Sequence, residues 1–455
     1  MKKRSELRLP ISGEARRDLK PLQISRSEAV IAHFMLSVPA MMKPGFFLSA
    51  ALAAAILLAP LGTGVDGIAA HGGEDYATLE KLGAVLFDDP NLSMNRTMAC
   101  STCHMQAAGF SDARESEKVG RDVSLGDDGI SLGDRNAPTA AYAKFTPPFG
   151  KNAAGEYIGG QFWDGRASLL EDQAGGPPLN PVEMGMPDKA AVVKRLRENP
   201  DYVAAFGTQF GKDVFASDES AYAAMTKALA SFERSDEFST FDSKYDRFLR
   251  GEEKLTDQEE LGRVLISSTQ FTNCNTCHEI RGAKGLEDGL FTNHKYFNIG
   301  VPANTSVRAV NGSKPDAVDL GLAQNPAVAG DPAQRGKFKV PTLRNVAVTG
   351  PYMHNGVFKD LRTVVLFYVK YKSKKPSRQI NPETGKTWDA PEVPENIAMT
   401  ELTSAPALDD KRVDAIVAFL KTLTDRRYEH LLPKEDGQTA APTAQPVLSV
   451  TPKAP

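Results

Sequence analysis

Two short cysteine–histidine segments are the features of the sequence that point most directly to chemistry. The first contains Cys100, Cys103 and His104, and the second contains Cys274, Cys277 and His278. In a Cys-x-x-Cys-His segment, both sulfurs can form thioethers with the vinyl groups of one haem, and the histidine can bind the haem iron. All three side chains must reach one porphyrin from one short turn, so the spacing is specific. The sequence therefore predicts two covalently bound haem c groups.

Two other uses of the four cysteines compete with haem attachment. The two pairs could bind one structural zinc ion, or they could form two disulfides in an oxidising compartment. The pairs lie far apart in the chain, and no cysteine is left over. Neither alternative needs the histidine that follows each pair. We therefore favour haem at both segments.

The remaining histidines indicate how the two haems differ. Residues 105–277 contain no histidine, and their methionines are Met105, Met184, Met186 and Met225. A haem with strong ligands on both faces carries electrons, whereas a haem with one open face can bind peroxide or oxygen. The first haem has no obvious histidine for its second face within its own domain. It is therefore the candidate for the open, reactive haem.

The bulk composition is that of an ordinary soluble globular protein. The chain has 455 residues, of which 41% are hydrophobic and 24% are charged, so it has room for two or three domains. The net charge of −3 gives no sign of a nucleic-acid partner or of strong attraction to an anionic membrane.

The N-terminal region predicts export. Residues 46–59 (FFLSAALAAAILLA) form a largely apolar run that is too short for a membrane span of about 20 residues. The run fits a signal peptide with cleavage near Ala69 and Ala70 and with the true start at Met41 or Met42. An uncleaved anchor is the alternative. We expect a periplasmic protein of the Gram-negative type, with no stable membrane span after cleavage.

A weak internal duplication precedes the two haem segments. LEKLGAVLF at 79–87 and EELGRVLI at 259–266 share a Leu-Gly pair and leucines four residues apart, as a buried helix face requires. Thr256 and Glu259 have the spacing of a capping box at the start of the second helix. Chance similarity of two helices is the alternative, but the haem segments that follow favour two related haem domains.

The fold is predicted to be mainly α, with two cytochrome-c-like haem domains and long ordered loops. Residues 217–234 and 409–424 are typical of further helices, whereas Pro and Gly are dense at 133–187 and 294–356, and strand signals are few. The expected domains are an N-terminal extension with the signal peptide (1–70), a first haem domain (71–245), a second haem domain (246–432) and a disordered tail (433–455).

Four segments of the sequence resemble the bacterial di-haem cytochrome c peroxidase and MauG family. They are GDRNAPT (133–139), QFWDGRASLLEDQAGGPPLNPVEMG (161–185), FNIGVP (297–302) and VPTLRNVAVTGPYMHNG (340–356). The resemblance covers roughly residues 75–430, and its motifs are long and occur in order. It implies a peroxidatic haem in the first domain and an electron-transfer haem in the second.

The resemblance implies roles for individual residues of the first domain. His104 would bind the iron of the peroxidatic haem, Glu183 would be the acid–base residue on its open face, and Gln173 would line the same pocket. Trp163 would lie between the haems and relay electrons. Cleavage of the peroxide O–O bond needs a proton moved between the two oxygens, which a buried carboxylate can do. Without the motif, Glu183 would be taken for a loop carboxylate and Trp163 for a core aromatic.

The resemblance also implies an inter-domain calcium site. Asn136, Thr349 and Pro351 match the positions that hold calcium in the family, and carbonyl and side-chain oxygens suit Ca²⁺. Ordinary turn residues are the alternative. The resemblance places His354 near the calcium and haem region but not on iron, and His294 is expected to be structural.

The sequence departs from the electron-transferring peroxidases of the family at the second haem. Those enzymes have a methionine ligand 14 residues after the histidine of a PY-x-H motif, whereas this chain has Tyr368 at that distance from His354, as in the MauG-like branch. Tyrosinate favours higher iron oxidation states, whereas methionine favours the ferrous form. A packed aromatic is the alternative for Tyr368, and Tyr371, Met353 or Met399 could bind instead.

A second departure concerns the first haem. The family's peroxidases block the resting peroxidatic haem with a loop histidine, which this chain lacks, so both departures favour the MauG-like branch. The preferred function is a periplasmic di-haem c-type oxidoreductase that uses hydrogen peroxide to form high-valent haem and oxidise a partner protein. One alternative is a cytochrome c peroxidase that reduces peroxide to water with electrons from a small redox protein. The other, non-enzymatic alternative is a two-haem electron carrier.

Overall fold

The computed structural model describes residues 76–280, 289–328 and 330–433. The predicted signal peptide and start site, and residues 434–455 of the predicted tail, lie outside these ranges. The described residues all fall in one unit of packed chain. Within them, no helix combines the length and apolar character needed to cross a membrane.

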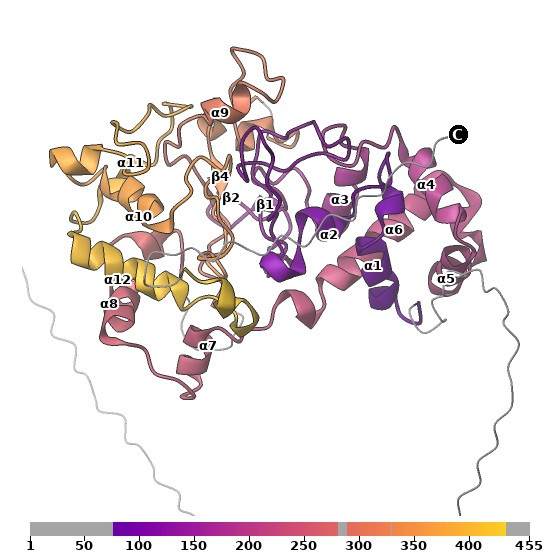
Figure 1. Ribbon diagram of the computed structural model, residues 1–455, viewed down its shortest axis with the longest axis horizontal. Coiled ribbons are helices and arrows are strands. Elements are labelled where there is room, and N and C mark those ends of the chain that lie inside the picture. Colours follow the sequence, from indigo (N-terminus) through magenta and orange to yellow (C-terminus); the bar gives the residue numbers. More distant parts are fainter. Residues whose placement is uncertain (1–75, 281–288, 329, 434–455) are drawn as a thin grey trace, which may run out of the picture. The chain divides into compact units, whose positions relative to one another are not determined.

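Helices dominate the described residues, which confirms the prediction of a mainly α fold (Figure 1). The first half contains α1 (Leu79–Phe87), α2 (Cys100–Cys103), α3 (Leu170–Ala174), α4 (Lys189–Arg197), α5 (Pro200–Phe210), α6 (Asp218–Glu233) and α7 (Lys244–Leu249). The second half contains α8 (Asp257–Ser267), α9 (Thr305–Arg308), α10 (Leu361–Val369), α11 (Met399–Thr403) and α12 (Asp410–Lys421). The helices predicted at 217–234 and 409–424 correspond to α6 and α12, and Thr256 caps α8 as predicted.

The strands of the described residues are short and lie in the regions rich in Pro and Gly. β1 (Gly150–Lys151) pairs antiparallel with β2 (Tyr157–Ile158), and β3 (Tyr296–Phe297) pairs antiparallel with β4 (Phe338–Lys339). In the second pair, Tyr296 is opposite Lys339. Each of these two-residue strand pairs holds two segments of a long loop region together by backbone hydrogen bonds. The loops can therefore line a cavity without forming a larger sheet.

The internal duplication corresponds to two equivalent helix pairs. α1 packs on α6, and α8 packs on α12 (Figure 1). The shared glycine lies at each contact: a Cβ on Gly83 would lie 1.9 Å from the carbonyl oxygen of Ala228, and a Cβ on Gly262 would lie 2.0 Å from that of Ala415. No side chain fits at such distances, so glycine lets the helix backbones touch. The Leu-Gly similarity therefore reflects a packing requirement of both halves.

We expect Gly262→Ala to lower the free energy of unfolding by about 2 to 3 kcal/mol, because the added methyl group must push α12 away from α8. Gly207, inside α5, provides the matched control, since a Cβ there meets nothing within 4 Å. Gly207→Ala should leave the stability unchanged or raise it by about 0.5 to 1 kcal/mol, because alanine favours helix. Urea denaturation followed by circular dichroism measures both variants. Equal effects of the two substitutions would contradict the close approach of the helices.

Two hydrophobic cores surround these helix pairs. The first gathers buried side chains of α1, α4, α5 and α6, and the second gathers those of α8, α10 and α12. In the sequence, the buried residues of the first core end at Phe238 and those of the second begin at Tyr245. The division into two haem domains near residue 245 stays a prediction, and the separate cores are compatible with it.

A buried polar cluster joins the two halves of the chain. Asp425 accepts hydrogen bonds from the hydroxyl group of Tyr142 (2.7 Å) and from the side-chain amide of Asn345 (2.9 Å). Arg344 forms a bidentate ion pair with Asp246, with N–O distances of 2.8 and 2.9 Å, and both side chains are only 1% exposed. The Arg344 guanidinium group also lies over the ring of Tyr142. The VPTLRN segment is therefore fixed against both halves.

Candidate active site

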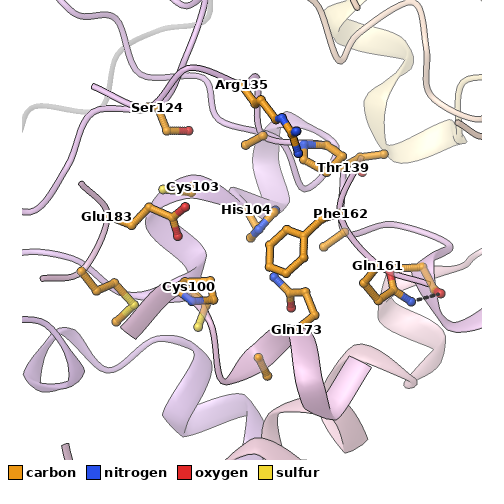
Figure 2. A pocket seen from close by; sticks show the side chains of 18 of the residues that line it. Cys100, Cys103, His104, Ser124, Arg135, Thr139, Gln161, Phe162, Gln173 and Glu183 are labelled. Atoms are coloured by element: carbon orange, nitrogen blue, oxygen red, sulfur yellow. Dashed lines mark hydrogen bonds between the residues drawn. The ribbon is translucent and has the colours of Figure 1, made fainter. Parts of the chain in front are cut away.

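The first Cys-x-x-Cys-His segment forms a single helical turn. α2 carries both cysteines, and His104 ends the helix. The Nδ1 atom of His104 lies 3.2 Å from the carbonyl oxygen of Phe110, which leaves Nε2 as the ring atom available to iron. Both cysteines and His104 line one cavity, which Figure 2 shows with Glu183 and Gln173 around it.

The second segment repeats this arrangement. Cys274–Thr276 forms one 3-10 turn, and the Nδ1 atom of His278 lies 2.9 Å from the carbonyl oxygen of Phe291. The two acceptors, Phe110 and Phe291, share a left-handed backbone conformation with φ values of 57° and 55°. Both cysteines and His278 line a second, largely apolar cavity. The two attachment turns are thus similar in geometry as well as in sequence.

The residues of both cavities fit a covalently held haem. None of the four cysteines forms a disulfide in this structure. Burial lowers the pKa of His104 and of His278, which favours the neutral imidazole, the form that binds iron. The two cysteine pairs line separate cavities, so they are not placed to share one zinc ion.

Glu183 faces the first cavity. Burial raises the pKa of Glu183, and this rise is partly offset by the charge of Arg166 and by a hydrogen bond from Nδ2 of Asn180 to Oε1 (2.8 Å). The carboxyl group therefore exchanges its proton at a less acidic pH than an exposed glutamate does. In Figure 2 the carboxyl group of Glu183 and the amide of Gln173 both point into the space beside His104.

Three further side chains that were not predicted line the first cavity. The guanidinium group of Arg166 lies 3.7 Å from the ring centroid of Phe162, whose φ is 63°. Glu233 is a buried carboxyl group at the end of α6, and burial raises its pKa to about 8. Arg166 and Phe162 lie inside the QFWDGR segment, so the sequence contained a signal for them. Glu233 carried no motif, and its helix alone did not indicate that it faces a cavity.

We expect Glu233→Gln to stabilise the protein increasingly as the pH rises. The pKa of Glu233 is raised in the folded protein from an ordinary value of 4.5 to about 8, so the folded protein binds this proton more tightly than the unfolded chain does. The stability that the proton contributes is present below pH 4.5 and is lost as the pH rises through 8. The glutamine variant avoids that loss and should be more stable than the parent by about 2 to 4 kcal/mol at alkaline pH.

Urea denaturation at a series of pH values measures this difference. Glu219→Gln is the matched control, because Glu219 lies on the same helix with its side chain 74% exposed. The control should show no comparable trend with pH. A stability difference between Glu233→Gln and the parent that stays constant from about pH 5 to about pH 9 would contradict the raised pKa.

Trp163 lies where three cavities meet. It lines both haem cavities and also a third cavity, and its Nε1 donates a hydrogen bond to the carbonyl oxygen of Asn136 (2.9 Å). The three predicted calcium ligands, Asn136, Thr349 and Pro351, line this third cavity together. Nδ2 of Asn136 donates to the carbonyl oxygen of Asp122 (3.2 Å), so Oδ1 is the atom it could offer to a cation. The calcium site and the relay role of Trp163 stay predictions.

Some of the candidates for the sixth ligand of the second haem do not line the second cavity. Tyr368 and Met353 both line the second cavity. Tyr371 is not among the residues that line it and donates its hydroxyl group to the carbonyl oxygen of Ile299 (2.9 Å). Met399 is 47% exposed and also lies outside the lining. Tyr368 and Met353 therefore remain, and the choice of Tyr368 stays a prediction.

His354 and His294 lie near the predicted calcium ligands. The ring of His354 stacks on that of Phe338 with a centroid separation of 3.6 Å, and its carbonyl oxygen accepts the backbone N–H of Asn136 (2.8 Å). Burial lowers the pKa of His354 to about 3, so its ring is neutral. His294 lines the third cavity. His354 also lines the second haem cavity, so it lies beside Asn136 and that cavity alike, and its placement off the iron stays a prediction.

Comparisons with known proteins agree with these features. Residues 77–254 match a family model described as di-haem cytochrome c peroxidase. The chain is 56% identical to the methylamine utilization protein MauG of Paracoccus denitrificans over 354 residues, which cover 78% of this chain and 90% of that protein. It is 35% identical to the cytochrome c peroxidase Ccp of Escherichia coli over 295 residues, which cover 64% of this chain and 53% of that protein. The crystal structure of the diheme peroxidase BthA from Burkholderia thailandensis is similar with a TM-score of 0.70 and 31% identity, over 80% of this chain and 90% of that chain.

Proposed function

The chain belongs to the di-haem cytochrome c peroxidase and MauG family, and on this premise we propose that it uses hydrogen peroxide to oxidise a periplasmic partner protein. It is a haem peroxidase-type oxidoreductase with two haem cofactors. We choose a MauG-like reaction because Tyr368 lines the second haem cavity. An electron-transferring peroxidase of the family would have a methionine ligand to the iron at this position. The 56% identity to MauG supports the same choice.

The two haems are assigned to the two cysteine–histidine turns. Thioethers would form at Cys100, Cys103, Cys274 and Cys277, and the Nε2 atoms of His104 and His278 would bind the irons. When bound, the haems supply the redox chemistry that takes up the oxidising equivalents of peroxide. The protein supplies the position of the reactants, the axial ligands and the movement of protons.

Glu183 handles the proton in the first cavity. Its carboxylate would take a proton from one peroxide oxygen and return it to the other, which leaves as water. Gln173 lines the same cavity and would orient the peroxide with its side-chain amide. Trp163 touches both haem cavities and would pass electrons from the second to the first. Each of these three side chains therefore has a separate task.

The proposal also includes a bound calcium ion, a periplasmic location and a protein partner. Asn136, Thr349 and Pro351 would offer neutral oxygens to Ca²⁺ in the third cavity, where no carboxylate belongs to the set. Export to the periplasm is inferred from the apolar run at 46–59 and from the attachment of c-type haem after translocation. The partner would be a periplasmic redox protein or protein substrate that gives up electrons through the protein surface.

A peroxide-reducing enzyme is the second candidate, and Met353 favours it. The side chain of Met353 lines the second cavity and could bind iron in place of Tyr368. Such an enzyme would take two electrons from a small redox protein and two protons from water, and would convert one H₂O₂ into two water molecules. The similarity to the Escherichia coli cytochrome c peroxidase is compatible with this reaction.

Tyr368→Met separates the two candidates. If the MauG-like proposal is right, the fully oxidised parent reacts with hydrogen peroxide in a stopped-flow absorption experiment without prior reduction. The variant should then show a changed spectrum and a higher midpoint potential of the second haem, because methionine stabilises the reduced iron. Met353→Leu is the matched control and should change neither. Parental spectra in Tyr368→Met together with altered spectra in Met353→Leu would instead identify the peroxide-reducing enzyme.

A further inference from the structure

A lysine on the wall of two cavities has no anionic partner among the residues that the structure describes. Lys339 belongs to β4 and lines both the second haem cavity and the third cavity. Its backbone N–H donates to the carbonyl oxygen of Trp163 (2.9 Å), which fixes its main chain beside the tryptophan. Its ammonium group donates to the carbonyl oxygen of Gly160. Burial lowers the pKa of Lys339 to about 8, as expected for a cation that has lost its water.

The carboxylate that acts electrostatically on Lys339 is already paired with other cations. Asp164 influences Lys339 electrostatically, but its Oδ2 lies 2.7 Å from Arg135 and its Oδ1 lies 3.0 Å from Arg166. Over the described ranges of the chain, no Asp or Glu oxygen lies within 4.0 Å of the Lys339 ammonium group. A partly buried ammonium group without an anion is unfavourable, because one carbonyl cannot replace the hydration it has lost. The site therefore lacks a negative group on its cavity side.

We propose that Lys339 binds a propionate carboxylate of the second haem. This inference rests on the proposed function, which places a haem in the second cavity, and every haem carries two propionates on the edge opposite its vinyl groups. The cysteines that would hold the vinyl edge line the second cavity but not the third, whereas Lys339 lines both. Lys339 thus reaches a part of the wall that the attachment cysteines do not line, where the propionate edge is expected. The ion pair gives the ammonium group its missing partner.

The ion pair also affects the second haem electrostatically. A positive charge near the porphyrin stabilises the reduced iron, which carries one more electron than the oxidised iron. Lys339 therefore raises the midpoint potential of the second haem and opposes the effect of a tyrosinate ligand. Because its backbone is bonded to Trp163, the same contact holds the propionate edge close to that indole. Lys339 is a positioning residue in this scheme.

Lys339→Gln tests the proposal in the holoprotein, with Lys337→Gln as the charge-matched control. Lys337 lies two residues earlier, lines neither haem cavity and donates its ammonium hydrogen to Gln334 (3.1 Å). We expect Lys339→Gln to keep both haems and to lower the midpoint potential of the second haem in spectroelectrochemical titration. Lys337→Gln should leave both potentials at the parental values. An unchanged second-haem potential in Lys339→Gln would overturn the proposal.

Infrared difference spectroscopy identifies the anion that pairs with Lys339. It tests the proposal even if the Lys339→Gln variant cannot be produced. Haem made from 5-aminolevulinate with a ¹³C-labelled carboxyl group carries the label in its propionates only. Lys339→Arg keeps the charge but changes the donor geometry, so it should shift the labelled carboxylate band. Shifts confined to unlabelled bands would identify a protein carboxylate or a free anion and overturn the proposal. Failure of the proposed function would appear separately, as an oxidised parent protein that does not react with peroxide.

Discussion

Glu183→Gln should slow the reaction of the oxidised protein with hydrogen peroxide by about 10²- to 10⁴-fold, the usual effect of losing a positioned acid–base group. Glutamine has nearly the same shape as glutamate, and its amide oxygen can keep the hydrogen bond from Asn180 that now reaches Oε1. It cannot take a proton from one peroxide oxygen and return it to the other. Stopped-flow absorption at about pH 7 measures the second-order rate constant.

The pH dependence gives an independent test of the same role. Burial raises the pKa of Glu183, and the carboxylate is the form that accepts the first proton. The rate of the parent should therefore increase as the pH rises through this raised pKa, and the increase should disappear in Glu183→Gln. Glu171→Gln is the control, because Glu171 pairs with Arg234 (2.7 Å) outside the cavity lining. A parental rate in Glu183→Gln would assign the proton transfer to another group, such as Glu233.

Local interactions explain which parts of the fold could be predicted from the sequence. The capping box at Thr256, the alanine-rich α6 and the two cysteine turns all depend on residues within a few positions of each other. α4 and α5 carry equally local signals in the sequence. Asp188 caps α4 through the backbone N–H of Ala191 (2.8 Å), and Pro200 opens α5. These two helices were therefore predictable on the same physical grounds.

The walls of the cavities depend on contacts that one sequence does not reveal. Arg135 pairs with Asp319 (2.7 Å) across 184 positions of the chain, and Lys339 meets Trp163 across a similar separation. Such contacts form because loops rich in Pro and Gly are held by a few distant partners rather than by their own hydrogen bonds. Glu183 was therefore singled out only through the family motif, and Glu233 and Lys339 were not singled out at all.

Asp246→Ala should lower the free energy of unfolding by about 3 to 5 kcal/mol, because it leaves the guanidinium group of Arg344 buried without its carboxylate. Asp410→Ala is the matched control: Asp410 also contacts two arginines, Arg362 and Arg378, but its side chain is 65% exposed. Removing that exposed carboxylate should cost no more than about 1 kcal/mol. Urea denaturation at about pH 7 measures both losses.

The free energy of unfolding at acidic pH shows whether the charge of Asp246 is responsible for the stabilisation. Burial alone would raise the pKa of Asp246, but hydrogen bonds from Arg344 and Ser243 outweigh burial and hold the pKa below its ordinary value of 3.8. The stabilisation is therefore present above pH 3.8 and is lost as the pH falls through the lowered pKa. The gap between parent and Asp246→Ala should narrow over this range. A gap that keeps its full size in acid would mean that Asp246 acts by filling space rather than through its charge.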